Sequence, residues 1–413
     1  MRLQSSLLLS VAAASVVAAE TQFYFYGFGR AGVESSTDAL ADEGGWIQLP
    51  FEFSDNSLIA NITIGTPPQE VGLIIDTGSS EFWVQTAANP FCEDPDSDDP
   101  CVYGTYNSSA SSTVSRLEEA FYLSYLDNTY AKGVYAVETF GVGGATLLNQ
   151  TFAIASKGNI SSGLMGVGFE SVESAATKYN GVLHSLKDQG YISSMVYSLY
   201  TNDLGSAGNL LFGGIDRAKY DGDLVSLPIA PNDEGQYQDL RVYLQSFGIE
   251  NPDKKTKTFN SSINTAFVLD SGTTGMNLPT DLFMDLVDYL GAELNSTYDA
   301  YIFSNCQDYV SFDDGSSNYT VIFGFDGITI KVPLAYVVQS LSDDDHDTCA
   351  ISVAPSNDPY SYILGDFFLN AAYAVYDFEN YVIALAQANY EVEREDIVAV
   401  RSGNNSIADA VAS

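Results

Sequence analysis

Two aspartates occur in matching sequence contexts in the two halves of this 413-residue chain. One context is Ile74-Ile75-Asp76-Thr77-Gly78-Ser79-Ser80, and the other is Val268-Leu269-Asp270-Ser271-Gly272-Thr273-Thr274. Two apolar residues followed at once by Asp, a hydroxyl residue and Gly predict a buried strand that turns sharply and presents a carboxylate at its end. Each half therefore offers one carboxylate on a tight turn.

A second matched element follows each aspartate at a similar distance along the chain. It reads Leu164-Met165-Gly166 in the first half and Ile363-Leu364-Gly365 in the second. Repetition of order and spacing indicates that the halves are two copies of one structural unit. A two-fold relation between the copies would bring Asp76 and Asp270 face to face.

Two carboxyl groups in contact predict acid–base chemistry on a water molecule. They cannot both ionise at low energy, so one pKa rises, the other falls and the pair shares a proton. The ionised member can deprotonate water while the protonated member hydrogen-bonds a carbonyl, with no covalent intermediate. Thr77, Ser79, Ser271 and Thr273 would hold the carboxylates in place, and Gly78 and Gly272 would let the two backbones approach without a Cβ clash.

Composition limits the possible partners. With 54 acidic and 16 basic residues the formal charge is −38 and the isoelectric point is near 4.1. Such a surface repels nucleic acid and anionic membranes at neutral pH, so we expect neither as a partner. The acidity fits either a well-solvated secreted protein or one that works at low pH, where carboxylates are protonated. The length favours two lobes in one chain, and we expect a monomer.

The N-terminus predicts secretion. Arg2 is followed by an apolar run that ends in small residues, which is typical of a signal peptide at residues 1–19. We expect a propeptide or N-terminal extension at 20–47, lobes at 48–222 and 223–397, and a tail at 398–413. No later segment has the roughly 20 apolar residues that span a bilayer, and no lipid-anchor signal ends the chain. The predicted location is extracellular, with retention at the cell wall left open.

The secretory route has two chemical consequences. The four cysteines should be oxidised, and their clustering favours the pairs Cys92–Cys101 and Cys306–Cys349. Close zinc-type cysteine pairs are absent and the only histidines are His184 and His346, so we expect no metal and no cofactor. Glycans are expected at several of the Asn-x-Ser/Thr sites, which begin at Asn61, Asn107, Asn149, Asn159, Asn260, Asn295, Asn318 and Asn404.

Short β-branched and aromatic runs between turn residues predict a mostly β protein. Two such runs are 58–65 and 210–214. Apolar residues at helical spacing predict a helix over 281–290 and a shorter one near 183–189. The glycines at 141–144 predict a hairpin turn and not a phosphate-binding loop, because no lysine or helical pattern follows.

The chain resembles the pepsin family, and in detail it resembles the fungal secreted branch that includes candidapepsins and yapsins. The resemblance covers about residues 58–390 and rests on both Asp-(Thr/Ser)-Gly turns and four further motifs. These are Asn61-Ile62-Thr63-Ile64-Gly65-Thr66-Pro67-Pro68-Gln69, Phe82-Trp83-Val84, Leu211-Phe212-Gly213-Gly214-Ile215-Asp216 and Tyr362-Ile363-Leu364-Gly365-Asp366-Phe367. The resemblance implies a bilobal acid protease fold of two related β lobes, with a central cleft and a hairpin flap.

The resemblance also implies roles for individual residues. Asp76 and Asp270 match the catalytic pair of an endopeptidase that cleaves polypeptides and is inhibited by pepstatin-like peptides. Tyr125 matches the flap tyrosine, and Trp83 would be its hydrogen-bond partner. Asp127, two residues further along the flap, would favour Lys or Arg just before the scissile bond while hydrophobic residues are still accepted. Its alternative role is to shape the turn together with Asn128.

Two departures from the family pattern concern latency and the flap. Leu126 stands where the family usually has glycine, which stiffens the hairpin tip. The segment after the signal peptide contains few cations, and its aromatic run 23–30 would either add a strand to the sheet or fill the cleft.

Other functions remain as alternatives to a peptidase. A catalytically silent relative that binds peptides would keep the fold without the chemistry, although both aspartates are intact. A glycosidase requires its carboxyls about 5 Å or more apart. A serine peptidase requires a histidine near its nucleophile, and neither histidine lies in a recognisable motif.

Overall fold

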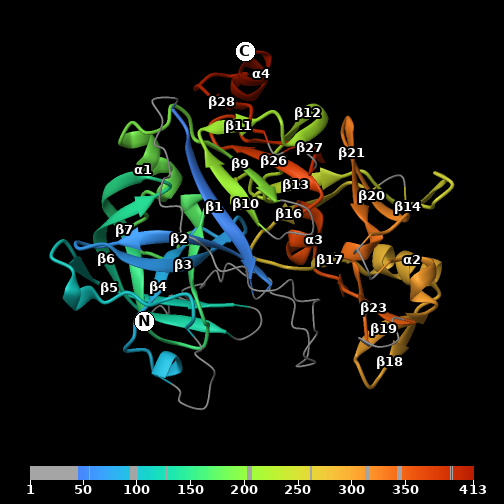
Figure 1. Cartoon of the computed structure of the whole chain (residues 1–413), viewed down its shortest axis with the longest axis horizontal. Coiled ribbons are helices and arrows are strands. Elements are labelled where there is room, and N and C mark those ends of the chain that lie inside the picture. The colour runs from blue at the N-terminus through green and yellow to red at the C-terminus, as the bar shows by residue number, and fades with distance from the viewer. Residues whose placement is uncertain are drawn as a thin grey trace, which may run out of the picture.

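β-strands dominate the computed structural model, as the sequence predicts. It describes residues 45–54, 56–93, 101–125, 129–201, 207–260, 263–311, 316–341, 347–390, 392 and 394–413. The predicted signal peptide, the aromatic run at 23–30 and His346 lie outside these residues. Among the described residues no helix is long and apolar enough to cross a membrane. Figure 1 shows the early strands on the left, the late ones on the right and a shared sheet between them.

One sheet of 13 strands includes most of the N-terminal half and two strands from near the C-terminus. In spatial order its strands are β12 (Tyr220–Pro228), β27 (Val382–Ala388), β26 (Ala372–Asp377), β9 (Val196–Thr201), β10 (Ala207–Phe212), β1 (Ile47–Ser54), β2 (Ser57–Ile64), β3 (Gln69–Asp76), β8 (Gly163–Gly166), β4 (Phe82–Gln85), β7 (Ala145–Gly158), β6 (Tyr130–Val142) and β5 (Ser115–Ser124). Because β26 pairs with β9, this sheet joins the two halves of the chain.

Four smaller sheets complete the strand set of the described residues. A five-stranded sheet contains β13 (Arg241–Leu244), β16 (Thr265–Leu269), β25 (Ile363–Leu364), β17 (Met276–Pro279) and β24 (Val353–Ser356). One four-stranded sheet contains β15 (Thr256–Asn260), β14 (Ser246–Glu250), β20 (Thr320–Phe325) and β21 (Ile328–Pro333). Another contains β18 (Glu293–Asn295), β19 (Ala300–Ser304), β23 (Thr348–Ile351) and β22 (Val338–Ser340). The last sheet pairs β11 (Gly214–Asp216) with β28 (Ile397–Ala399).

The described α-helices are short and few: α1 (Val182–Asp188), α2 (Thr280–Leu290), α3 (Asp366–Leu369) and α4 (Ser406–Ala412). The first two are the helices predicted from the sequence. Helix α2 buries the apolar positions that predicted it, and Gly291 ends it at φ +66°, a left-handed conformation that glycine adopts without strain.

The internal repeat in the sequence is a structural repeat. In the first half β3 pairs in parallel with β8, which pairs antiparallel with β4. In the second half β16 pairs in parallel with β25, which pairs antiparallel with β17. The strand before each aspartate therefore lies beside the second matched element, and both turns leave equivalent sheet positions.

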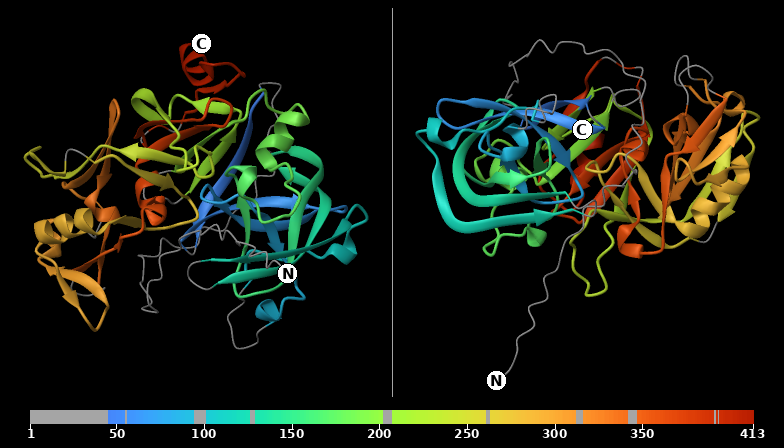
Figure 2. Two further views of the ribbon diagram at one scale, coloured as in Figure 1. Left: turned by 180° about the vertical axis from the view of Figure 1, so that it is seen from behind. Right: turned by 90° about the horizontal axis from the view of Figure 1, so that it is seen from below.

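The C-terminal residues pack against the shared sheet. Strand β28 pairs with β11, and Val400, Ile407 and Ala410 are buried in one cluster with residues of β9 and β26. Figure 2 shows the two β-rich parts from behind and from below, with this segment at their junction. Three residues of the predicted tail thus contribute to this buried cluster.

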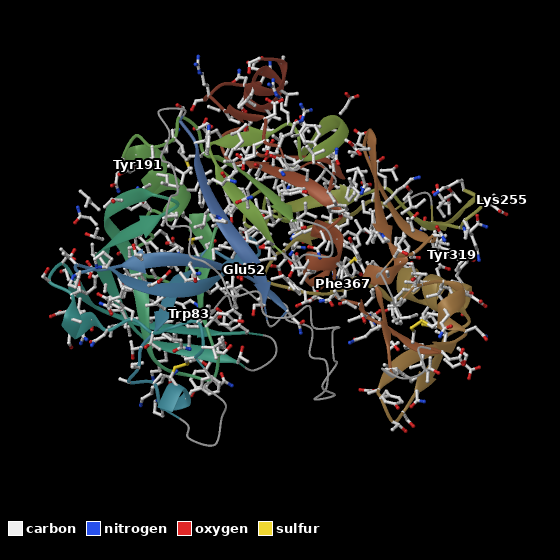
Figure 3. The ribbon with its side chains drawn as sticks, in the orientation of Figure 1. Glu52, Trp83, Tyr191, Lys255, Tyr319 and Phe367 are labelled. Atoms are coloured by element: carbon white, nitrogen blue, oxygen red, sulfur yellow. A yellow bond between two sulfur atoms is a disulfide. The ribbon has the colours of Figure 1, made fainter. Side chains whose placement is uncertain are left out.

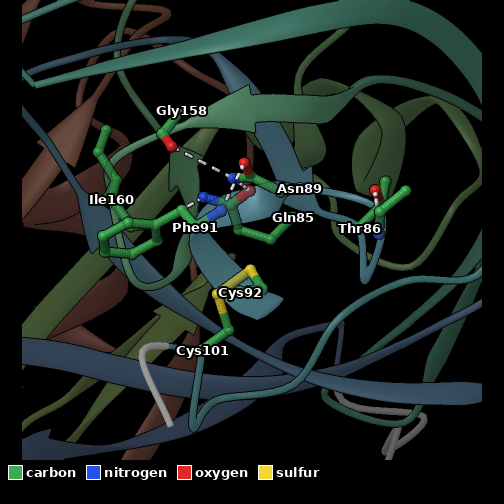
Figure 4. The surroundings of a disulfide bond; sticks show 9 residues. Gln85, Thr86, Asn89, Phe91, Cys92, Cys101, Gly158 and Ile160 are labelled. Atoms are coloured by element: carbon green, nitrogen blue, oxygen red, sulfur yellow. Dashed lines mark hydrogen bonds between the residues drawn. A yellow bond between two sulfur atoms is a disulfide. The ribbon is translucent and has the colours of Figure 1, made fainter. Parts of the chain in front are cut away.

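Both disulfides are the pairs that the clustering of the cysteines favoured, Cys92–Cys101 and Cys306–Cys349. Figure 4 shows the first beside Asn89, whose amide donates to the side chain of Gln85 and to the carbonyl of Gly158. This disulfide therefore lies next to strands β4 and β7.

The predicted glycosylation sites lie at accessible positions. Asn61, Asn107, Asn149, Asn159, Asn318 and Asn404 are exposed, and Asn260 and Asn295 are half-buried. The glycine turn at 141–144 connects β6 and β7, as predicted. Glycosylation itself remains a prediction.

Candidate active site

The two aspartate turns abut at the junction of the halves. Asp76 is the last residue of β3, and Asp270 directly follows β16. A Cβ atom on Gly78 would lie 2.4 Å from Cγ of Asp270, and one on Gly272 would lie 2.5 Å from Oδ1 of Asp76. Both glycines are therefore required by the close approach of the opposite carboxyl group.

Hydroxyl side chains brace each turn against the backbone of the other. Thr77 Oγ1 donates to the carbonyl of Leu269 at 2.8 Å and accepts from the N–H of Ser271 at 2.9 Å. Ser271 Oγ donates to the carbonyl of Ile75 at 2.8 Å and accepts from the N–H of Thr77 at 3.1 Å. These four bonds fix the relative position of the two turns.

Each carboxylate accepts an equivalent pair of hydrogen bonds. The N–H groups of Gly78 and Gly272 donate to Oδ1 of Asp76 and of Asp270, both at 2.8 Å. The hydroxyl of Thr273 donates to Oδ2 of Asp270 at 2.7 Å, and that of Ser79 donates to Oδ2 of Asp76. The two carboxyl groups lie close enough for each to alter the pKa of the other. All eight residues that the repeat singled out are thus brought together.

Burial shapes the electrostatics of the pair. Asp76 is 1% exposed and Asp270 is 2% exposed. Burial raises the pKa of both carboxyls, and the negative charge of Asp76 raises the pKa of Asp270 further. Hydrogen bonds from Ser79 and Gly78 oppose the rise at Asp76. Both shifts favour a state in which the two carboxyls hold a single proton between them.

A third carboxyl group, Asp366, lies near the pair and has no role in the sequence-based prediction. It is 1% exposed, and neither of its oxygens has a hydrogen-bond partner among the described residues. Burial, followed by the charges of Asp270 and Asp76, raises its pKa well above the usual value. The repeat contained a signal for it, because the residue after the second matched element is Val167 in one half and Asp366 in the other.

Tyr125 lies at the end of the hairpin formed by β5 and β6. The indole nitrogen of the fully buried Trp83 donates to the Tyr125 hydroxyl at 3.1 Å, which is the predicted contact. Figure 3 labels Trp83 within the N-terminal half and Phe367, from helix α3, across the junction. Leu126, Asp127 and Asn128 lie outside the described residues.

A second acidic cluster, which the sequence did not indicate, lies just beyond the Asp76 turn. The buried Glu81 accepts hydrogen bonds from the hydroxyls of Tyr135 at 3.1 Å and Tyr179 at 3.2 Å. Its neighbour Glu173 accepts from the N–H of Tyr179 at 2.9 Å. Burial raises the pKa of Glu173 to about 8, and the charge of Glu81 adds to that rise. Among the described residues no group of three or more metal-ligating side chains could hold an ion.

Comparison with known proteins agrees with this geometry. The sequence profile described as eukaryotic aspartyl protease matches residues 57–388. The probable aspartic-type endopeptidase OPSB of Arthroderma benhamiae is 34% identical over 374 residues, which cover 86% of this chain and 73% of that protein. Secreted aspartic protease 8 of Candida albicans is 36% identical over 364 residues, covering 85% and 80%.

A third relative, aspartic proteinase MKC7 of Saccharomyces cerevisiae, is 30% identical over 445 residues, covering 89% of this chain and 73% of the relative. The family profile spans both aspartate turns and both matched elements, so it includes the whole repeat. All three relatives are fungal, in keeping with the resemblance noted from the motifs. The chain belongs to the eukaryotic aspartyl protease family and is an aspartic-type endopeptidase.

Proposed function

We propose that the protein is a secreted endopeptidase that cleaves polypeptides at acidic pH through a water molecule activated by Asp76 and Asp270. One observation carries the proposal: two buried carboxyl groups on equivalent turns lie so close that each turn's glycine abuts the carboxyl group of the other turn. Such a pair with one proton provides a base and an acid at the same point. Secretion is supported by the apolar N-terminal run and by the name of the Candida relative.

The protonation state suggests how the work is divided. The ionised Asp76 takes a proton from the water molecule as the water oxygen attacks the carbonyl carbon of the scissile bond. At the same time Asp270 gives its proton to the carbonyl oxygen. When the C–N bond of this tetrahedral intermediate breaks, Asp76 returns its proton to the leaving nitrogen and Asp270 recovers one from a hydroxyl group of the intermediate. The pair ends in its starting state, so no cofactor is consumed.

This mechanism sets the pH dependence. Activity requires a single proton on the pair, so it should be highest between the two macroscopic pKa values of the pair and should fall in stronger acid as Asp76 is protonated. It should also fall at higher pH as Asp270 loses its proton. We propose an optimum below neutrality, inhibition by pepstatin and action as a monomer.

The direct test is to replace each aspartate by its amide. Asp76→Asn and Asp270→Asn should each lower the turnover of casein or haemoglobin at acid pH by at least about 100-fold, given the contribution of acid–base catalysis. Asp253→Asn, at an aspartate with 71% of its side chain exposed, is the matched control and should leave activity unchanged. Pepstatin should abolish the wild-type activity. An amide variant that keeps more than about one hundredth of wild-type turnover would refute the assignment.

A further inference from the structure

Exposed rings gather on the outer face of the hairpin formed by β5 and β6. Cross-strand partners in an antiparallel sheet point to the same side, and three exposed pairs share this face: Tyr122 with Lys132, Ser124 with Tyr130 and Ala120 with Val134. Tyr122 is 58% exposed and Tyr130 is 37% exposed. The opposite face holds Phe121 and Ala131, which are buried in one cluster with Trp83. We call the six exposed residues the outer hairpin face.

Strand β7 extends the outer hairpin face on one side. Lys157 pairs with Lys132 and is exposed, so Tyr122, Lys132 and Lys157 form a row across three strands. On the other side β5 is the last strand of the 13-stranded sheet among the described residues. An apolar face beside a sheet edge invites pairing between molecules, and proteins counter this by covering it. The outer hairpin face is therefore a surface that needs a cover.

A glycosylation sequence begins at the end of β7, directly beside this face. Asn159 follows the last residue of β7 and starts Asn159-Ile160-Ser161. Its Oδ1 accepts from the N–H of Tyr130 at 2.8 Å, and its N–H donates to the carbonyl of Tyr130 at 3.2 Å. Asn159 thus lies opposite Tyr130, two positions after Lys157. The alternation of side chains along a strand puts it on the same side of the sheet as Lys157.

These hydrogen bonds orient the Asn159 amide for modification. They use Oδ1 and the backbone of Asn159, and the side chain is exposed. A glycan is attached through the other side-chain atom, Nδ2. The first sugar therefore starts next to the ring of Tyr130, in a position that the two bonds to Tyr130 hold fixed.

The chemistry of the outer hairpin face suits a neutral sugar. Tyrosine rings offer flat apolar faces for the C–H groups of a sugar ring, and the ammonium groups of Lys132 and Lys157 can each donate to hydroxyl oxygens. From β7 the chain of sugars has to cross two strand spacings of about 4.8 Å each to reach β5. Covalent attachment makes these contacts intramolecular, so individually weak contacts suffice.

We infer that Asn159 carries a glycan whose first sugars lie on the outer hairpin face, over Tyr130 and Tyr122. In the attachment step Nδ2 loses a proton to solvent and bonds to C1 of the first sugar, while the bond from C1 to a lipid diphosphate carrier breaks. The inference rests on the secretory route of the proposed function and not on peptidase activity. The glycan covers the edge of the sheet and leaves the inner face of the hairpin, toward Trp83, unchanged.

The test compares the protein secreted by a eukaryotic host with its Ser161→Ala variant. This change at an exposed residue destroys the glycosylation sequence and keeps both bonds between Asn159 and Tyr130. Enzymatic release of glycans in heavy-oxygen water, followed by peptide mass spectrometry, should mark Asn159 as occupied in the wild type. Nitration by tetranitromethane should then be several-fold faster at Tyr122 and Tyr130 in Ser161→Ala than in the wild type. Tyr243, 39% exposed in the C-terminal half, should react equally in both.

Two further variants are controls for this comparison. Ser161→Thr keeps a glycosylation sequence, so it should restore the slow nitration of Tyr122 and Tyr130. Thr297→Ala removes the sequence that begins at Asn295, in the other half of the chain, at an exposed position. It should leave the nitration of Tyr122 and Tyr130 as slow as in the wild type.

The outcomes separate this inference from the proposed function. If other asparagines are glycosylated and Asn159 is not, the inference is wrong and secretion stands. It is also wrong if Asn159 is occupied but Tyr122 and Tyr130 react equally in the wild type and in Ser161→Ala. If no asparagine is glycosylated and the protein is not exported, the secretory route fails and the inference fails with it. The hydrolysis assay of the aspartate variants judges the peptidase chemistry independently.

Discussion

Thr77 and Ser271, which lie 194 residues apart in the sequence, each accept a hydrogen bond from the backbone N–H of the other through a side-chain hydroxyl. Both residues are buried, so water cannot replace these bonds. The relative position of the two aspartate turns therefore depends on a pair of side chains and not only on the strands behind them.

Thr77→Ala should lower both stability and activity. It removes the partner of the Ser271 N–H and of the Leu269 carbonyl, and each buried group left unpaired costs about 1–3 kcal/mol. The free energy of unfolding, measured by urea denaturation, should fall by this order, and kcat should fall because the carboxyls lose their alignment. Thr77→Ser keeps the hydroxyl and is the matched control. Equal loss in both variants would contradict the role given to Oγ1.

Asp366→Val should stabilise the protein, and more so as the pH rises. In the folded protein the pKa of Asp366 is raised well above its unfolded value of 3.8, so it stays protonated after the unfolded chain has ionised. Each pH unit above the unfolded value then lowers the stability of the wild type by about 1.4 kcal/mol, up to the folded pKa. Valine, the residue at the equivalent position 167, removes this dependence.

The measurement is Tm of wild type and Asp366→Val at pH 3.5, 5 and 6.5. The Tm of Asp366→Val should exceed that of the wild type by an amount that grows from pH 3.5 to pH 6.5. Asp253→Asn, at an exposed position, should show no such trend. A constant difference across the series would show that Asp366 ionises as freely in the folded protein as in the unfolded chain.

Glu173→Gln should flatten the decline of stability toward neutral pH. The pKa of Glu173 is about 8 in the folded protein, mainly because it is buried, and 4.5 is its ordinary value. The folded state therefore holds one more proton than the unfolded state between these values, and wild-type stability falls as pH rises through this window. Glutamine can still accept from the N–H of Tyr179, so it retains the hydrogen bond without the titration.

Urea denaturation at pH 5 and pH 7.5 gives the comparison. The decrease in the free energy of unfolding from pH 5 to pH 7.5 should be smaller in Glu173→Gln than in the wild type. The exposed control Glu70→Gln should show the same decrease as the wild type. If the free energy of unfolding decreases equally in all three proteins, a group other than Glu173 causes the pH dependence.

Asp127→Ser tests the predicted preference at the cleaved bond. If the Asp127 carboxylate faces the residue just before that bond, the ratio of kcat/KM for Lys and Leu peptides should fall several-fold in the variant, at a pH where Asp127 is ionised. An unchanged ratio would leave Asp127 as a turn residue beside Asn128. Hydrolysis of the Leu peptide is the internal control.

Much of this site could be predicted from the sequence because its signals are local. A strand, an aspartate, a hydroxyl residue and a glycine stand next to one another, and their repetition identifies the pair of turns. The repeat shows that Asp366 stands where the other half has Val167, but it could not show that Asp366 is buried, because a carboxylate after a glycine can equally face solvent. The hydrogen bond between Tyr179 and Glu81 joins residues 98 positions apart, and no local sequence pattern predicts it.

The fold shows the same division between local and distant signals. Alternating strands, the amphipathic helix over 280–290 and the close cysteine pair at 92 and 101 are local patterns, and all are present. The insertion of β26 and β27 beside β9 is a long-range pairing that hydrophobic spacing cannot specify. The left-handed conformation of Tyr381 could not be predicted from local preference, because asparagine and glycine are the residues that usually adopt it.

The packing of the last residues also affects how the chain folds during synthesis. The N–H of Asp396 donates to Asp216, 180 residues earlier, and β28 then pairs with β11. Contacts between such distant residues form slowly, and the N-terminal half leaves the ribosome long before its partner strand exists. Until residues 397–412 emerge, the apolar side chains of β9 and β11 that they cover stay exposed. The nascent N-terminal half would therefore expose this apolar surface until residues 397–412 have been synthesised.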